Sequence, residues 1–344
     1  MKKLLVTGGC GFIGSCFVLR QIKAGNLVVN LDALTYAANQ NNLSKIKGNS
    51  KIKGNSNYHF VKGDILDQKL VSEILEKFEI DILVNFAAES HVDNSISNPG
   101  AFIQTNINGT FALLNSALKY WQNLPDKRKE DFRFIHISTD EVYGSLTLEE
   151  PRFTENNKYQ PNSPYSASKA ASDHLVRAWN ETYKLPTIIT NCSNNFGARQ
   201  HSEKLIPTVI KACLNNKDIP IYGNGKNIRD WIYVEDNCFG IDLAIAKGKI
   251  GESYCFGGDA ERQNIDIAGQ ICKILDGLQP KLDRKGSNIS YANQIKFVED
   301  RKGHDFRYAI DSSKAKKELG FKVDGSFEEK LTATVNWYLN QINN

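Results

Sequence analysis

The strongest constraint on the fold of this chain is a glycine-rich turn near its amino terminus, where an apolar run leads into the sequence GGCGFIG at residues 8–14. Gly8, Gly11 and Gly14 are spaced three residues apart. Glycine allows a tight turn and lets backbone N–H groups approach a diphosphate, and the amino terminus of a following helix adds partial positive charge. Because this turn follows a predicted strand and opens a predicted helix, it predicts a dinucleotide-binding unit.

Short apolar runs alternate with longer amphipathic segments through the first half of the chain. This alternation predicts a parallel sheet covered by helices on both faces, with ligands beyond the carboxyl ends of the strands. The predicted strands are 3–7, 27–31, 58–61, 82–86, 132–138 and 187–191, and the predicted helices are 12–24, 68–78, 101–121 and 164–183.

Loops lengthen after about residue 191, although helices are still predicted at 264–278, 312–319 and 326–340. We therefore predict an α/β fold with two parts. A Rossmann-like doubly wound parallel sheet forms from residues 1–191, with a later segment, roughly 230–257, returning to it. A smaller mixed substrate domain forms mainly from residues 192–344.

The hexamer KIKGNS occurs twice in succession, at residues 45–50 and 51–56. A single duplication does not make a repeat protein. The segment is polar and lies between a helix signal and a strand, which predicts a duplicated surface loop.

Composition excludes several other classes of protein. The 344 residues carry a formal net charge of +4 with scattered basic residues, which does not favour nucleic acid or a membrane surface as a partner. The apolar run at the amino terminus is too short for a signal peptide, and no stretch approaches the ~18 apolar residues of a membrane span. Seven widely spaced cysteines with no CxxC pair predict reduced thiols in the cytoplasm and no metal site.

Asp32 ends the second predicted strand, eighteen residues after Gly14. A carboxylate there can accept hydrogen bonds from both hydroxyls of an adenine ribose and would repel a 2′-phosphate, which favours NAD over NADP. A turn-forming aspartate is the alternative interpretation. Asp64 at the end of the third strand could contact the adenine amino group or simply cap a helix.

Tyr165 and Lys169 stand four residues apart in a predicted helix, which puts both on one face. A free tyrosine has a pKa of about 10 and is a poor base at neutral pH. A nearby ammonium group and the positive nicotinamide ring of NAD⁺ stabilise the phenolate and are expected to lower the pKa of Tyr165. The pair predicts that Tyr165 takes a proton from a sugar hydroxyl as hydride leaves the same carbon.

Two adjacent carboxylates, Asp140 and Glu141, follow the fifth predicted strand. Like charges at close range raise the pKa of one of them, so the pair suits one protonated acid and one ionised base. Elimination of water needs that combination, whereas a 4-epimerase needs neither group. A solvated pair of loop residues is the alternative.

With these motifs the chain resembles the extended short-chain dehydrogenase/reductase family over nearly its whole length. The resemblance implies a Rossmann-like NAD domain, a carboxy-terminal sugar-nucleotide domain, and Thr139 as the third member of the Tyr165–Lys169 group. Within that family it is most similar to the 4,6-dehydratases of dTDP-glucose. That similarity rests on the doublet after Thr139 and on AAESHVD at 87–93, TNCSNN at 190–195, KLIP at 204–207, RDW at 229–231 and DRKGHD at 300–305.

The resemblance also implies a role for each catalytic residue. Tyr165 takes the O4 proton while hydride passes from C4 to NAD⁺. Glu141 removes the proton at C5, Asp140 protonates the departing C6 hydroxyl, and hydride returns to C6. The cofactor is then retained, and the product is a 4-keto-6-deoxy sugar nucleotide.

Further binding residues and a homodimer follow from the same resemblance. The dimer is expected to pair helices 101–121 and 164–183. Residues expected near NAD are Phe12, Ile13, Ile65, Ala87, Ala88, Ser90, Thr105 and Asn195. Residues expected near the nucleotide sugar are Ser90, Thr139, Asn194, Lys204, Leu205, Pro220, Tyr222, Arg229, Asn264, Arg301 and His304. Among these, Arg229 has a planar guanidinium that suits a diphosphate.

Three alternatives remain at this point. A dehydratase for a GDP-, UDP- or CDP-sugar and a nucleotide-sugar 4-epimerase share the fold, and the acidic doublet argues against the epimerase. A non-catalytic binding protein of the same fold would have lost Tyr165, Lys169, Thr139 or Asp32 and would carry a basic face, and neither is seen.

Overall fold

The computed structural model describes residues 1–44, 57–282 and 286–342. The duplicated hexamer, and with it the predicted surface loop, lies outside these described residues.

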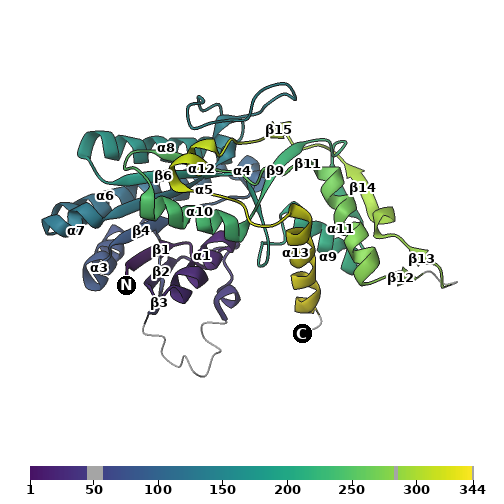
Figure 1. Cartoon of the computed structure of the whole chain (residues 1–344), viewed down its shortest axis with the longest axis horizontal. Coiled ribbons are helices and arrows are strands. Elements are labelled where there is room, and N and C mark those ends of the chain that lie inside the picture. Colours follow the sequence, from purple (N-terminus) through teal and green to yellow (C-terminus); the bar gives the residue numbers. More distant parts are fainter. Residues whose placement is uncertain (45–56, 283–285, 343–344) are drawn as a thin grey trace.

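A seven-stranded sheet forms the centre of the larger half of the molecule (Figure 1). Its strand order is β10-β6-β5-β4-β1-β2-β3, and every pair is parallel. The order reverses direction between β1 and β4, which is where doubly wound sheets bind their ligands. The predicted fold class is confirmed. The strands are β1 (Lys3–Thr7), β2 (Leu27–Asp32), β3 (Tyr58–Lys62), β4 (Ile82–Asn85), β5 (Arg133–Thr139), β6 (Thr187–Cys192) and β10 (Ser253–Phe256).

Helices cover both faces of this sheet because successive residues of a strand point to opposite faces, and the residues on both faces are apolar. Leu4 and Val6 of β1 join one core and Leu5 joins the other, and all three are buried. On the first face lie α1 (Phe12–Lys23), α10 (Val234–Lys247) and α12 (Ser313–Leu319), and on the second lie α3 (Gln68–Phe78), α6 (Thr110–Gln122) and α8 (Pro164–Tyr183).

A separate apolar core organises the smaller lobe, on the other side of the molecule in Figure 1. It forms between α9 (Leu205–Leu214), α11 (Asn264–Leu278) and α13 (Phe327–Ile342). Strand β9 (Ile228–Tyr233) pairs with β7 (Asn194–Phe196), β11 (Glu261–Gln263) and β15 (Arg307–Tyr308), and β8 (Ile219–Tyr222) pairs with β14 (Ile295–Val298).

Shorter elements complete the described chain. They are α4 (Val92–Ser97), α5 (Pro99–Phe102), α7 (Asp126–Asp131), β12 (Lys281–Leu282), β13 (Asn288–Ile289) and the 3-10 turns η1 (Gln40–Leu43), η4 (Asp140–Tyr143) and η5 (Tyr291–Gln294). None of the helices described is long and apolar enough to cross a bilayer.

The helix predicted at 101–121 is not one regular helix. It divides into α5, a π-helical segment η3 (Ile103–Gly109) and α6. Buried Asn106 explains the irregularity, because its amide accepts from the Glu89 N–H and donates to the Glu89 carbonyl and the Ser168 hydroxyl. Such π segments occur mostly at functional sites, and this one carries Thr105.

Candidate active site

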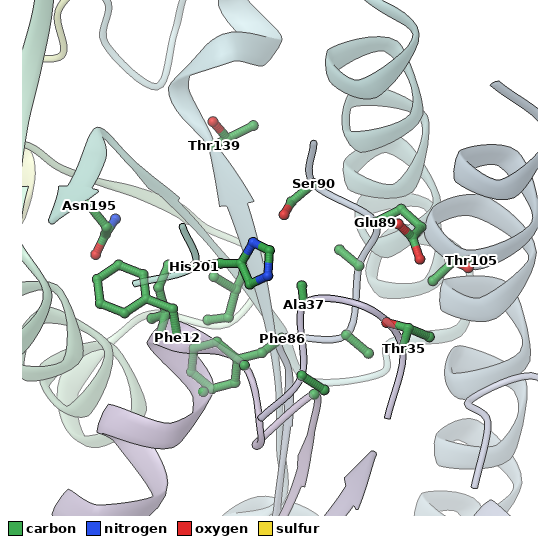
Figure 2. Close-up of a pocket in the computed structure, with 18 of the residues that line it drawn as sticks. Phe12, Thr35, Ala37, Phe86, Glu89, Ser90, Thr105, Thr139, Asn195 and His201 are labelled. Atoms are coloured by element: carbon green, nitrogen blue, oxygen red, sulfur yellow. The ribbon is translucent and has the colours of Figure 1, made fainter. Parts of the chain in front are cut away.

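A cavity of about 310 Å³ opens at the carboxyl ends of the central strands, above the point where the strand order reverses. All five residues predicted to be catalytic line it, and so do all fifteen predicted to bind the cofactor, among which Tyr165 and Lys169 are counted a second time. Figure 2 shows Phe12, Ser90, Thr105, Thr139 and Asn195 around this space. The structure thus brings the predicted residues together, while their individual roles stay predictions.

The glycine turn lies at the amino terminus of α1, where a bound diphosphate could approach its backbone closely. Gly8 has a positive φ of 67°, and a Cβ atom there would lie 2.8 Å from the Ala87 nitrogen. A Cβ at Gly14 would lie 2.3 Å from the Gly8 carbonyl oxygen, so this packing needs glycine. No side chain caps α1, and its first turn contains no acidic residue. This cradle fits a dinucleotide diphosphate.

The position of Asp32 fits both interpretations drawn from the sequence, a turn-forming aspartate and an acceptor for the ribose hydroxyls. Its carboxylate accepts hydrogen bonds from the backbone N–H groups of Cys10 and Leu34, each at 2.8 Å, and so holds the glycine turn and the loop after β2 together. Each oxygen has a second lone pair, and the residue lines the cavity. Asp64 also lines it, but its Oδ1 accepts from the Leu66 N–H, as a turn-forming aspartate does.

Helix α8 carries Tyr165 and Lys169 into the cavity beside Thr139 at the end of β5. The pKa of Tyr165 is raised well above its ordinary value, first by burial and then by the negative charge of Glu141. This contradicts the lowered pKa expected from the sequence. The reason is that burial and the charge of Glu141 disfavour the phenolate, while the ammonium group of Lys169 donates to the Ile137 carbonyl oxygen at 2.7 Å.

The acidic doublet lines the first cavity, with Asp140 buried and Glu141 partly buried, and is not a solvated pair of loop residues. Burial, and next the charge of Glu141, raise the pKa of Asp140 well above its ordinary value. Burial also raises the pKa of Glu141, but the positive charges of Lys204 and Arg229 oppose that rise. Asp140 Oδ2 is buried without a hydrogen-bond partner in the described chain. The two environments suit a protonated Asp140 and an ionised Glu141.

A second cavity continues from the first toward the smaller lobe, and Glu141, Asn194 and Lys204 line both. Of the residues predicted for substrate, Ser90 and Thr139 line only the first cavity, and the rest line the second. Those in the second are Asn194, Lys204, Leu205, Pro220, Tyr222, Arg229, Asn264, Arg301 and His304.

Cationic side chains give the second cavity a positive wall. The guanidinium of Arg229 lies 4.2 Å from the ring centroid of Tyr308 and donates to the Asp305 carbonyl oxygen. Arg301 lies over the Tyr222 ring and is held by Asp93 at 2.6 Å. Such an arrangement suits a ligand with a diphosphate and an aromatic base.

Several lining residues carried no recognisable signal in the sequence. His201 points into the first cavity near Ala37 and Phe12 in Figure 2. Its ring meets that of Tyr36 edge to face, and its Nδ1 lies 3.3 Å from Glu203 Oε2. These contacts join the loop after β2 to the segment before α9, so only the three-dimensional arrangement reveals them.

The described part of the chain contains no group of three or more His, Cys, Asp or Glu side chains that could hold a metal ion.

Comparison with known proteins gives a consistent result. The profile of the family described as "GDP-mannose 4,6 dehydratase" matches residues 5–334. A curated relative, the dTDP-glucose 4,6-dehydratase of Xanthomonas campestris pv. campestris strain B100, is 54% identical over 98% of this chain and 93% of its own length.

Two solved structures resemble the chain closely. The dTDP-glucose 4,6-dehydratase of Bacillus anthracis in complex with NAD has a TM-score of 0.84 and 39% identity, covering 100% of this chain and 98% of the other. DesIV of Streptomyces venezuelae, a dTDP-glucose 4,6-dehydratase with NAD and TYD bound, has a TM-score of 0.85 and 41% identity, with coverage of 99% and 98%.

Proposed function

This chain belongs to the nucleotide-sugar dehydratase family described by the GDP-mannose 4,6 dehydratase profile, and within it to the dTDP-glucose 4,6-dehydratases; on that premise we propose that it converts dTDP-glucose to dTDP-4-keto-6-deoxyglucose. The observation that carries the reaction type is the Asp140–Glu141 doublet, in which Asp140 is buried and lines the first cavity and Glu141 is partly buried and lines both. An epimerase has no use for an acid and a base next to the Tyr165–Lys169 pair.

The cofactor is NAD, as in the similar solved structures. Gly8, Gly11 and Gly14 line the first cavity at the amino terminus of α1 and would hold the diphosphate, and Asp32 has further lone pairs for the ribose hydroxyls. Bound NAD supplies first the acceptor and then the donor of one hydride, so it is not consumed in the cycle.

The side chains of the protein move the protons. Tyr165 takes the proton from O4 of the glucose, with Lys169 and Thr139 alongside. Positive charge from a bound nicotinamide ring would oppose the effect of Glu141 on the pKa of Tyr165.

Oxidation at C4 makes the neighbouring C5 proton acidic, and the second half of the reaction uses the doublet. Glu141, beside Lys204 and Arg229, is the base that removes the C5 proton. Asp140, which burial keeps protonated, gives its proton to the departing C6 hydroxyl.

The nucleotide part of the substrate fits the second cavity. The positive wall of Arg229 and Arg301 binds the diphosphate, and the Tyr222 ring, partly exposed, offers a surface for the base. Residues 1–191 with β10 and α10 form the NAD domain in this scheme, and most of residues 192–344 form the nucleotide-sugar domain.

We infer a homodimer from the helical face formed by η3, α6 and α8. Ile103, Phe111 and Tyr183 expose 51%, 42% and 46% of their surface there, and Phe111 packs edge to face on Trp179. Exposed aromatic side chains on neighbouring helices favour a protein interface. All seven cysteines are buried in the reduced thiol form, which fits a reducing compartment, and we assign the protein to the cytoplasm.

Incubation of the purified protein with dTDP-glucose, without added NAD, tests the proposed function. Mass analysis of the sugar nucleotide should show the loss of one water. A product of unchanged mass but altered configuration would indicate a 4-epimerase instead. Parallel reactions with GDP-mannose and UDP-glucose test the base, and faster dehydration of either would overturn the assignment of dTDP-glucose.

A further inference from the structure

Beneath Lys169 lies a buried charged group that none of the roles above uses. Asp173 follows Lys169 by one helical turn on α8, so the two side chains share a face. His136 of β5 lies between them: its Nε2 is 3.5 Å from Lys169 Nζ and 3.4 Å from Asp173 Oδ1. All three are almost fully buried, with exposures of 4%, 0% and 1%.

The hydrogen bonds around His136 define its tautomer. The Asn85 side-chain amide points its Nδ2 at His136 Nδ1, 3.3 Å away, while Asn85 Oδ1 accepts from the Thr7 hydroxyl. Because an amide nitrogen only donates, Nδ1 must accept, and the ring proton belongs on Nε2. The nearest acceptor to that nitrogen is the Ser172 hydroxyl at 3.2 Å, and Asp173 Oδ1 lies next at 3.4 Å. Burial and the charge of Lys169 lower the pKa of His136 to about 4, so the ring is neutral at physiological pH.

Asp173 is fixed by hydrogen bonds to one carboxyl oxygen, while the other, Oδ1, lies toward His136 and has no hydrogen-bond partner in the described part of the chain. Its Oδ2 accepts from the Ser138 hydroxyl at 2.7 Å and from the Tyr159 hydroxyl at 3.0 Å. A buried carboxylate is costly unless an opposite charge and hydrogen bonds compensate it. The opposite charge nearby is Lys169, whose pKa burial lowers and Asp173 raises.

We propose that Asp173, acting across the neutral ring of His136, is the counter-charge that keeps Lys169 an ammonium ion, and that it is therefore a positioning residue for the Tyr165 step. The inference rests on the proposed function, because it assumes that Lys169 must be charged when Tyr165 takes the O4 proton. The other titratable groups facing Lys169 are Tyr165 on the same helix, His136 on β5 and Cys192 on β6.

The test is the pH dependence of the first chemical step, followed as NADH absorbance in the first turnover after mixing with dTDP-glucose. That step needs Lys169 but neither Asp140 nor Glu141. Asp173→Asn keeps the shape and one acceptor oxygen but removes the charge. Lys169 should then lose its proton at lower pH, and the alkaline limb of the rate profile should move down by about one pH unit or more.

Two further variants separate charge from structure. Asp173→Ser also removes the charge and should move the limb in the same direction, which keeps the test decisive if Asp173→Asn does not fold. Asp236→Asn removes a buried carboxylate that pairs with Lys330, away from the cavities, and should lower the melting temperature without moving the limb.

The proposal is overturned if folded Asp173→Asn or Asp173→Ser, with normal NAD content, slows the step equally at every pH. That result would leave Asp173 a purely structural residue. A wild-type protein that neither reduces its cofactor nor dehydrates dTDP-glucose would instead refute the proposed function, so the two failures can be told apart.

Discussion

At the scale of single residues, the reaction divides between two groups in one cavity. Tyr165, Lys169 and Thr139 serve oxidation at C4, and Asp140 and Glu141 serve elimination. The surroundings of the two carboxylates affect their pKa values differently. Positive charge from Lys204 and Arg229 opposes the rise that burial causes in the pKa of Glu141. For Asp140, the charges of Glu141 and Asp230 raise the pKa further. This difference leads to a prediction about Glu141.

Glu141→Gln keeps the side-chain shape but removes the base. Loss of a general base typically costs ~10²–10⁴ in rate. The loss should fall on dehydration, so the variant should still reduce bound NAD when dTDP-glucose is added, and NADH absorbance should build up with little loss of water. Tyr165→Phe is the matched control and should fail before any NADH appears. Wild-type dehydration by Glu141→Gln, or a block of cofactor reduction as complete as that in Tyr165→Phe, would contradict this division.

Residues whose role depends on their neighbours in the sequence could be predicted, whereas residues whose role depends on contacts with distant parts of the chain could not. Tyr165 and Lys169 share a helix face, and their spacing of four residues shows this in the sequence. Asp140 and Glu141 are adjacent carboxylates, so an acid–base pair could be predicted from these two residues alone. The position of His201 in the cavity depends on a loop that meets the segment around Tyr36, more than 160 residues earlier in the chain. The rise in the pKa of Tyr165 was missed for the same reason, since it depends first on how deeply the fold buries Tyr165 and then on the charge of Glu141 beside it.

At the scale of elements, helix bounds could be predicted where the ends carry their own signals. The observed α8 coincides with the predicted helix because Ser163 forms a capping box, Pro164 occupies the first turn and Lys184 closes the end in a left-handed conformation. The break at η3 could not be predicted, because Asn106 bonds with Glu89 and Ser168 from other segments. Strand β10 and helix α10 were not predicted as separate elements either.

The exposed face of α6 and α8 is the proposed dimer interface, and a substitution there tests it. Phe111→Glu puts a carboxylate into the proposed dimer interface, where burying it without a partner is costly. We expect the variant to sediment as a monomer at concentrations where the wild type is a dimer. Phe297→Glu on β14 is the control, because Phe297 is 60% exposed and lies in the smaller lobe, and this variant should stay dimeric. A wild-type monomer, or a dimer unaffected by Phe111→Glu, would refute this interface.

At the scale of the whole molecule, two lobes with separate cores meet at one continuous site. The larger lobe supplies the glycine turn, Asp32 and the catalytic residues, and the smaller one supplies most of the positive wall for the nucleotide. The alternation of apolar runs was enough to predict the parallel sheet, because each buried strand is short and apolar. The arrangement of the smaller lobe was not predictable, since strands as short as β7, β11 and β15 leave no periodic signal.

The central claim is that one retained NAD carries hydride from C4 to C6 within a single turnover. The most direct measurement uses dTDP-glucose deuterated at C4, incubated in ordinary water with purified protein and no added cofactor. The account predicts a 4-keto-6-deoxy product that retains the deuterium at C6 and has lost one unlabelled water. Loss of the label to solvent, or its appearance in released NADH in proportion to product, would contradict the closed cycle.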